Sequence, residues 1–324
     1  MEKCMNGKIK RFLITLTLPI CVYLLFCILA GERFANLNVL RAIFIQSFIP
    51  LLCAYGMVFG RAMRMLDLSI GSRIIAASMI GGVMTIRYDL GVLGLVAITI
   101  VVCLLLGVIC GLVFTFFKIP SIVVSLVIAM VFEVIGAKVT GGMGFLGIPV
   151  ELAILGKMPY NLITVLVTTL LFYFVYYRTK FCYNVRAISG DELIAKGNGI
   201  KIAKTKFLAY VVGSLFLGIA AIIQMSYATS MSAKLSMESL AMAFKPLMAM
   251  IIGVQLQDDV GLPGGIFIGA FMISSLFSGL VAMGLPATTQ DIALGVFLVI
   301  VVSISTNTEA IAGFFGKFKK KSTA

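Results

Sequence analysis

Ionisable and polar side chains stand at a few points within long apolar stretches of this chain. Asp67, Ser69 and Ser72 lie in the segment LDLSIGS, Glu133 lies in the middle of VIAMVFEVIGA, and Gln290 heads the last apolar stretch. A charged group at the centre of a bilayer costs at least ~2.5–3.5 kcal/mol, so each such group is expected to face protein or water. These five residues are therefore candidates for a path along which a polar solute crosses a membrane.

The same residues also have a purely structural interpretation. Asp and Ser side chains accept hydrogen bonds from the free N–H groups at a helix start, so Asp67, Ser69 and Ser72 could cap a helix. The two roles are compatible, because a helix that starts inside a membrane protein must satisfy its backbone there. Gln290 could likewise cap the last helix. Glu133 could lie at an interface, or it could carry protons in an ion-coupled transporter.

The usual residues of enzyme and metal chemistry are missing from the sequence. It has no histidine, which is the commonest general base and the commonest metal ligand. None of its seven cysteines forms a CxxC pair, and no GxxxxGK[ST] nucleotide motif occurs. We therefore expect that the chain is not an enzyme and binds no metal or cofactor itself.

Composition places the chain in a membrane. Hydrophobic residues make up 61% and charged residues only 12%, against about 25% charged in soluble domains. The net charge of +13 could suggest nucleic acid, but the basic residues are dispersed among the apolar stretches. Retention of Lys and Arg in cytoplasmic loops explains the excess more simply, so no nucleic-acid partner is expected.

Ten apolar runs have about the ~20 residues that a membrane span needs. They lie at 12–30, 39–60, 68–86, 90–117, 121–140, 159–177, 207–229, 240–257, 261–284 and 288–306. The sequence therefore predicts an all-α, polytopic transmembrane helical bundle of about ten spans, organised as a single transmembrane domain over residues 1–324.

Basic residues predict the orientation of these spans. With ten spans and both termini in the cytoplasm, 19 Lys and Arg residues fall on the inner side and six on the outer side. The same count places the polar segment 178–206 inside. Spans two to five and spans seven to ten then run in opposite senses, and glycine-containing interruptions occur at 65–72 and 260–265. Two inverted repeats are therefore a further hypothesis.

The polar segment 178–206 carries the signals of a short capped helix. Ser189 at the N-cap and Glu192 at N3 have the capping-box spacing, and Gly197 or Gly199 could end the helix in the left-handed conformation. A rigid helix on basic arms between two spans is suited to receive a push from a partner protein.

Neighbouring residues support the same short helix. Ile188, just before the expected cap, could pack on Leu193 as a hydrophobic staple. Asp191 suits the positive start of the helix, and Lys196 suits its negative end. The expected helix therefore has consistent signals at both ends.

Three segments, in order along the chain, resemble the membrane permeases of ribose-type ABC importers. They are LDLSIGS at 66–72, the loop AISGDELIAKGNGI and the glycine-spaced run that ends in GGIFIGA. That family also serves galactosides, xylose and autoinducer-2. The positions of the loop that match the family pattern are Ala187, Ile188, Gly190, Ala195, Gly199 and Ile200, with Lys196 where a basic residue is usual.

The resemblance implies a permease subunit in the cell membrane that moves a monosaccharide or a related small polar solute. Its partners would be a cytoplasmic ABC ATPase that binds the ATP, a second permease subunit in a homodimer or heterodimer, and an extracytoplasmic solute-binding protein. The loop 178–206 would be the coupling loop on which the ATPase docks. Its candidate docking residues are Ser189, Gly190, Asp191, Glu192, Ala195, Lys196, Gly199 and Ile200.

The sequence also departs from the family pattern. Arg64 and Met65 occupy two positions where the family has glycines, and Asp258 and Asp259 replace a later glycine pair. Two other functions therefore stay open: an ion-coupled secondary transporter, and a degenerate or regulatory subunit that pairs with a second permease.

Overall fold

The computed structural model describes residues 19–117, 119–142 and 144–286, with 289–290, 292–293, 295–297 and 299. Residues 19–30 are helical. The helices that follow are α2 (Leu37–Gln46), α3 (Phe48–Ala62), α4 (Ile70–Arg87), α5 (Gly91–Phe116), α6 (Ser121–Val139), α7 (Tyr160–Arg178), α8 (Lys180–Gly190), α9 (Glu192–Gly197), α10 (Ile202–Ala228), α11 (Ala241–Gln255) and α12 (Gln257–Ala282). Single 3-10 turns are η1 (Gly31–Arg33), η2 (Leu152–Gly156) and η3 (Glu238–Leu240), and two short strands are β1 (Phe145–Gly147) and β2 (Ser230–Ser232).

Seven helices of the described residues are long and apolar enough to cross a membrane, by length and composition. They are Leu37–Ala62, Ile70–Arg87, Gly91–Phe116, Ser121–Val139, Tyr160–Arg178, Ile202–Ala228 and Gln257–Ala282. They correspond to seven of the ten predicted runs, and they confirm a polytopic helical membrane protein.

The count of ten spans is not confirmed. The run predicted at 240–257 is α11, whose 15 residues extend about 22 Å at 1.5 Å per residue, short of a ~30 Å hydrocarbon core. The runs predicted at 12–30 and 288–306 lie partly or mostly outside the described residues. The inverted repeats stay a prediction.

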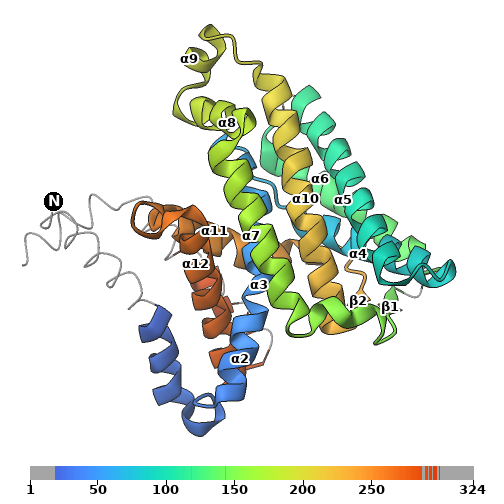
Figure 1. Cartoon of the computed structure of the whole chain (residues 1–324), viewed down its shortest axis with the longest axis vertical. Helices are drawn as coiled ribbons and strands as arrows, with labels where there is room; N and C mark the ends of the chain where they lie inside the picture. The colour runs from blue at the N-terminus through green and yellow to red at the C-terminus, as the bar shows by residue number, and fades with distance from the viewer. Residues whose placement is uncertain are drawn as a thin grey trace, which may run out of the picture. The chain divides into compact units, whose positions relative to one another are not determined.

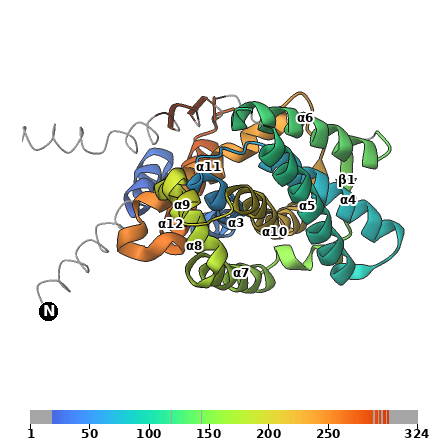
Figure 2. The ribbon, with the colours of Figure 1, turned by 90° about the horizontal axis from the view of Figure 1, so that it is seen from above.

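The chain divides into two compact units, residues 48–247 and residues 1–47 with 248–324. The first unit is built around α10, which packs against α5, α3 and α4. Figure 1 shows α10 running between α7 and α5, and Figure 2, seen along it, shows these helices around it. The expected single permease domain over 1–324 stays a prediction.

Glycines let the helices around α10 approach closely. A Cβ on Gly56 of α3 would stand 2.8 Å from the carbonyl oxygen of Gly213 in α10. A Cβ on Gly213 would stand 2.5 Å from the carbonyl oxygen of Gly56. Small residues at such crossings are the usual means by which membrane helices pack without a hydrophobic driving force. Beside the crossing, the rings of Tyr55 and Phe172 stack with centroids 4.1 Å apart.

A small antiparallel sheet lies at the C-terminal end of α10. Phe145 pairs with Ser232 and Gly147 pairs with Ser230, which joins the chain after α6 to the chain after α10. The sequence prediction did not include this sheet, because strands of three residues leave almost no periodic signal.

The second unit contains a tight helical hairpin made by α12 and the part of α11 from Met248 on. A Cβ on Gly265 would lie 2.5 Å from the carbonyl oxygen of Gly253, so the two backbones touch. Gly261, with φ 74° and ψ 157°, breaks the helical path inside α12. The glycine-containing interruption predicted at 260–265 is therefore a real kink. Asp258 and Asp259 fall in the first turn of α12, where acidic side chains suit the helix dipole.

Candidate functional site: a capped helix between two spans

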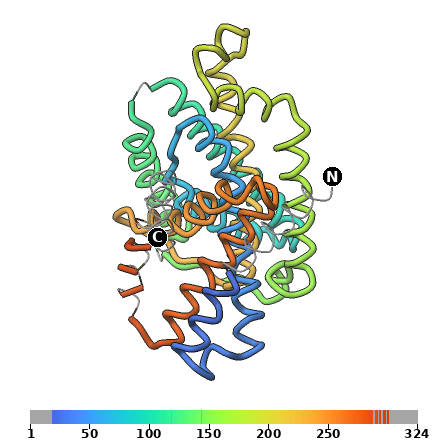
Figure 3. The backbone as a smooth tube through the Cα atoms, turned by 90° about the vertical axis from the view of Figure 1, so that its left-hand side faces the viewer, coloured from blue at the N-terminus to red at the C-terminus, as the bar shows by residue number. Residues whose placement is uncertain are grey.

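The polar segment forms two short helices between α7 and α10. Helix α8 follows α7 after Thr179, whose hydroxyl accepts a hydrogen bond from Cys182 N. Helix α9 follows α8 directly, and Figure 3 shows this yellow-green stretch at the end of its unit, beyond the neighbouring helices. A short helix between two spans, as predicted, is confirmed.

The cap of this helix differs from the predicted one. Asp191, not Ser189, is the N-cap of α9, and its Oδ1 accepts from Leu193 N at 2.7 Å and Ile194 N at 3.0 Å. Ser189 and Gly190 belong to the end of α8, so the capping-box prediction was wrong by two residues. The predicted staple is also wrong, because Ile188 is buried while Leu193 is 80% exposed.

Glu192 therefore has a different role from the one predicted. Both of its carboxylate oxygens lie 3.0 Å from Lys206 Nζ on the first turns of α10. The end of α9 agrees better with the sequence, because Gly199 adopts φ 80° and Ile200 N donates to Ala195 O. The start of the helix is thus tied to α10, and its end is closed by the turn at Gly199.

Helix α9 presents apolar side chains to its surroundings. Leu193 and Ile194 are 80% and 65% exposed, whereas Ala195 packs inward and is 3% exposed. Asp191 and Lys196 are exposed at the two ends of the helix. A capped, braced helix with two exposed aliphatic side chains has the form of a protein-docking element.

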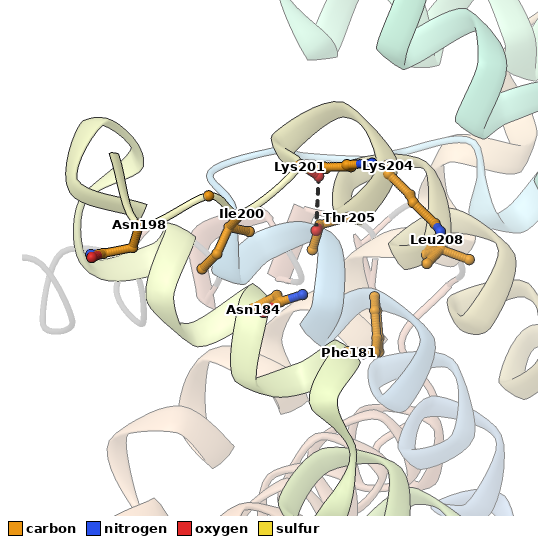
Figure 4. A pocket seen from close by; sticks show the side chains of 9 residues that line it. Phe181, Asn184, Asn198, Ile200, Lys201, Lys204, Thr205 and Leu208 are labelled. Carbon is orange, nitrogen blue, oxygen red and sulfur yellow. Dashed lines mark hydrogen bonds between the residues drawn. The ribbon is translucent and has the colours of Figure 1, made fainter. Parts of the chain in front are cut away.

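A pocket of about 610 Å³ lies between α8 and the start of α10. Figure 4 shows its lining, with Phe181 and Asn184 on α8 and Thr205 on α10. The remaining lining residues are Asn198, Gly199, Ile200, Lys201, Lys204 and Leu208. The sequence offered no signal for this pocket, because its walls come from two helices that only the fold brings together.

The residues of the LDLSIGS segment form a buried polar cluster. Asp67 Oδ1 accepts from both Ser69 N at 2.8 Å and Ser69 Oγ at 2.6 Å. Ser72 Oγ donates to Ser69 O at 2.8 Å, and Ser69 and Ser72 are fully buried. The segment runs from the connection after α3 into the first turn of α4, which begins at Ile70. Ser69 is the N-cap residue of α4 but makes no side-chain cap hydrogen bond, and Ser72 donates to a carbonyl, so the predicted capping role is not observed. The three residues hold one another at the start of α4, and their place in a solute path stays a prediction.

Arg73 is the member of this cluster that the sequence did not reveal. It forms an ion pair with Asp67, and its guanidinium donates to Ser214 Oγ of α10 at 2.8 Å and to Ser69 Oγ at 3.1 Å. Only 1% of Arg73 is exposed. The six-residue spacing to Asp67 was a usable signal. In the charge count, however, Arg73 looked like one more cytoplasmic basic residue.

Glu133 is buried and engaged with the backbone. Its Oε1 accepts from Ser239 N at 2.9 Å and its Oε2 accepts from Met237 N at 3.0 Å. Met237 has φ 68°, and η3 begins just after it. Gly71 lies against this turn, since a Cβ there would collide with Ser239 O. Glu133 therefore holds the turn before α11 against α4 and α6.

Gln290 is partly buried, and its Nε2 donates to Leu285 O at 2.9 Å. Among the residues that the structure describes, no group of three His, Cys, Asp or Glu residues could hold a metal ion.

One departure from the resembled family has a visible backbone counterpart. Arg64 stands at a position where the resemblance implies glycine, and it adopts φ 58°, in the left-handed region that a side chain disfavours. The position thus keeps a glycine-type conformation without the glycine.

Comparison with known proteins shows the family to which this chain belongs. Residues 39–302 match the family described as the permease component of a branched-chain amino acid transport system, and the chain belongs to this family. The predicted relationship to the permeases of ABC importers is thereby confirmed. The family is one of transport components, and the chain is a multi-pass membrane protein.

Several curated proteins are similar to this chain. The xylose transport system permease protein XylH of Haemophilus influenzae is 31% identical over 154 residues, which cover 47% of this chain and 40% of that protein. The autoinducer 2 import system permease protein LsrC of an Enterobacter species is 26% identical over 276 residues, covering 83% and 79%. LsrC of Photorhabdus luminescens is 24% identical over 301 residues, covering 90% and 89%.

A solved structure of an ABC transporter of metal-chelate type, in an inward-facing conformation, overlaps with a TM-score of 0.48 and 16% identity. The overlap covers 91% of this chain and 99% of that one. At this score the two folds are not shown to be the same.

Proposed function

We propose that this chain is the membrane-spanning subunit of an ABC importer for a monosaccharide or a related small polar solute. Membership of the permease family supports the transport role. The names of the relatives, for xylose and for autoinducer 2, support a small polar solute. The single observation that carries the proposal is α9, a capped helix with two exposed aliphatic side chains between two spanning helices.

Helix α9 is proposed as the docking element for a cytoplasmic ABC ATPase, which binds the ATP. Leu193 and Ile194 would enter an apolar groove of that partner, as amphipathic helices do in helix-in-groove recognition. The ion pair of Glu192 with Lys206 would then transmit the partner's motion to α10. On this proposal the segment 178–206 lies in the cytoplasm and the chain lies in the cell membrane. The charge count of the sequence supports a cytoplasmic position for both chain termini as well.

The opposite end of the same helices is proposed to face a solute-binding protein. Helix α10 begins beside α9 and ends beside β2, and Figure 1 shows the two ends far apart within this unit. The sheet of β1 and β2 would then lie on the extracytoplasmic side. A second permease subunit, identical or not, would complete the membrane part of the importer.

The proposed solute path keeps the five residues named from the sequence: Asp67, Ser69, Ser72, Glu133 and Gln290. The contacts support a positioning role for four of them, since Asp67, Ser69 and Ser72 fix the start of α4 and Glu133 fixes the turn before α11. They would shape the path by placing helices around it.

Reconstituted uptake tests the proposal. Vesicles containing this chain, a co-expressed ATPase and a solute-binding protein should accumulate labelled xylose or ribose when ATP is supplied. An ATPase variant that binds but does not hydrolyse ATP is the matched control and should give no accumulation. Uptake that an uncoupler abolishes, and that proceeds without the ATPase, would contradict the proposal.

The geometry of Glu133 bears on the ion-coupled alternative. A proton carrier must exchange its partners as it is loaded and unloaded, whereas both oxygens of Glu133 accept backbone N–H groups within one turn. That arrangement favours a structural task for Glu133, which fixes the turn before α11.

A further inference from the structure

The pocket between α8 and α10 is lined by basic side chains and, among the described residues, by no acidic ones. Among the nine described residues that line it, two are lysines and none is acidic. Asn184 and Thr205 add polar groups, and the pocket is open to the surroundings. The lining therefore favours a ligand that is negatively charged and accepts hydrogen bonds.

The two lysines differ from their neighbour Lys206. Lys206 is neutralised by Glu192, with Nζ 3.0 Å from the carboxylate. In the part of the chain that the structure describes, no ion pair or hydrogen bond engages Nζ of Lys201 or Lys204. Two free ammonium groups thus stand at the same pocket.

The start of α10 adds positive potential at the same place. This helix has 27 residues, its N-cap is Lys201, and no side chain caps its first N–H groups. Its first turn contains no acidic residue, although carboxylates are favoured there and lysines are not. The ammonium groups of Lys201 and Lys204 are repelled by the positive end of the helix dipole and by one another. An anion bound between them would offset both repulsions.

We propose that this pocket binds a phosphate group, either the headgroup of an anionic phospholipid or a small soluble phosphate. Phosphate has the acceptor oxygens that lysine ammonium groups and free helix N–H groups recognise. The proposal goes beyond transport, because it assigns a second ligand site to the chain.

The position of the pocket favours the lipid as the source. The candidate spans Tyr160–Arg178 and Ile202–Ala228 end and begin at this level, which is where lipid headgroups lie. Phe181, Ile200 and Leu208 give the pocket an apolar wall against which the glycerol region of a lipid would pack. Basic residues at the inner surface attract anionic lipids.

A ligand here would also brace α9. Asn198, Gly199 and Ile200 line the pocket and form the connection from α9 to α10. A phosphate bound to Lys201 and Lys204 would restrict this connection, so membrane composition could influence the stiffness of α9.

Lipid titration of the purified chain tests the inference without any transport measurement. The chain in detergent micelles is titrated with phosphatidylglycerol, with zwitterionic phosphatidylcholine or with inorganic phosphate, and its thermal unfolding is followed by circular dichroism. A ligand that binds only the folded state raises Tm with its concentration. The double variant K201Q/K204Q is compared with K180Q/K196Q, which removes two exposed lysines of the same segment outside the pocket.

Phosphatidylglycerol should raise Tm in the wild type and in K180Q/K196Q. Its affinity for K201Q/K204Q should be about 25-fold weaker, at roughly 5-fold for each lysine removed. If inorganic phosphate but not phosphatidylglycerol raises Tm, and if K201Q/K204Q abolishes that rise, the pocket binds phosphate and the ligand is a small soluble phosphate. Equal responses of all three proteins to phosphatidylglycerol, with no response to phosphate, would overturn the inference. So would the absence of any rise in the wild type.

Discussion

Glu192 and Lys206 join the start of α9 to the first turns of α10, with both carboxylate oxygens 3.0 Å from Nζ. The two residues are 14 positions apart and lie on helices with different tasks. Helix α9 is exposed, whereas α10 is the central helix of its unit. The pair is thus the direct polar link between the proposed docking element and the membrane helices.

Breaking the Glu192–Lys206 ion pair should reduce ATP-driven uptake more than it reduces the stability of the fold. Glu192→Gln is expected to change the free energy of unfolding by less than about 1 kcal/mol, because exposed ion pairs contribute little. ATP-driven uptake in the reconstituted system should fall, while the ATPase still co-purifies. The charge-swapped variant E192K/K206E should recover part of the uptake. If Glu192→Gln leaves uptake at the wild-type rate, the link does not carry the motion.

The exposed aliphatic pair of α9 should decide ATPase docking. L193S/I194S is expected to abolish co-purification of the ATPase, because two exposed side chains that would be buried in the complex become polar. The control Tyr183→Ser changes another large exposed side chain, 73% exposed on α8, and should keep the complex. Normal co-purification of the ATPase with L193S/I194S would contradict the docking role.

Removing one charge of the Asp67–Arg73 ion pair should destabilise the protein strongly. Asp67→Asn leaves the buried Arg73 without its counter-charge, and this is expected to destabilise the protein by roughly 3–5 kcal/mol. D67N/R73Q removes both charges and should be less damaging than Asp67→Asn alone. Thermal unfolding in detergent measures both. Equal Tm values for wild type and Asp67→Asn would show that the pair does not stabilise α4.

Glu133→Gln should loosen the turn before α11. The amide replaces one acceptor oxygen by a donor, so either Met237 N or Ser239 N faces an N–H group, at a cost of about 1–3 kcal/mol. The variant should unfold at a lower temperature and still show ATP-dependent uptake. Full stability together with loss of an uncoupler-sensitive uptake would instead favour the ion-coupled alternative.

Cys182 gives a pH-dependent test of the packing of α8. Burial raises the pKa of this thiol to about 11, although the neighbouring Arg186 acts in the opposite direction. The reactive thiolate is therefore scarce at pH 8, and labelling by a maleimide should accelerate about tenfold per pH unit up to pH 10. The rate is measured in a variant whose other cysteines are replaced by alanine. A rate that levels off near pH 8 would contradict this environment for Cys182.

The class of protein and most of the helices follow from local features of the sequence. Apolar runs of spanning length are local in the chain, so seven of the ten predicted spans correspond to helices of spanning length in the described residues. The turn at Gly199 that terminates α9 and the interruption at Gly261 were also predictable, because glycine is the residue that permits a positive φ. The start of α9 was misplaced, since Ser189 and Asp191 are both good caps and only the extent of α8 decides between them.

The tertiary structure alone decided the contacts between distant segments. The guanidinium of Arg73 donates to Ser214, 141 positions away, and Glu133 accepts from Ser239, 106 positions away. No spacing in the sequence announces such pairs, because they depend on which helices pack together. The pocket beside Lys201 and Lys204 is likewise a product of packing, since α8 and α10 form its walls only after the chain folds back between them. Local propensity and hydropathy thus specify the helices, and helix packing specifies the partners of the buried charges.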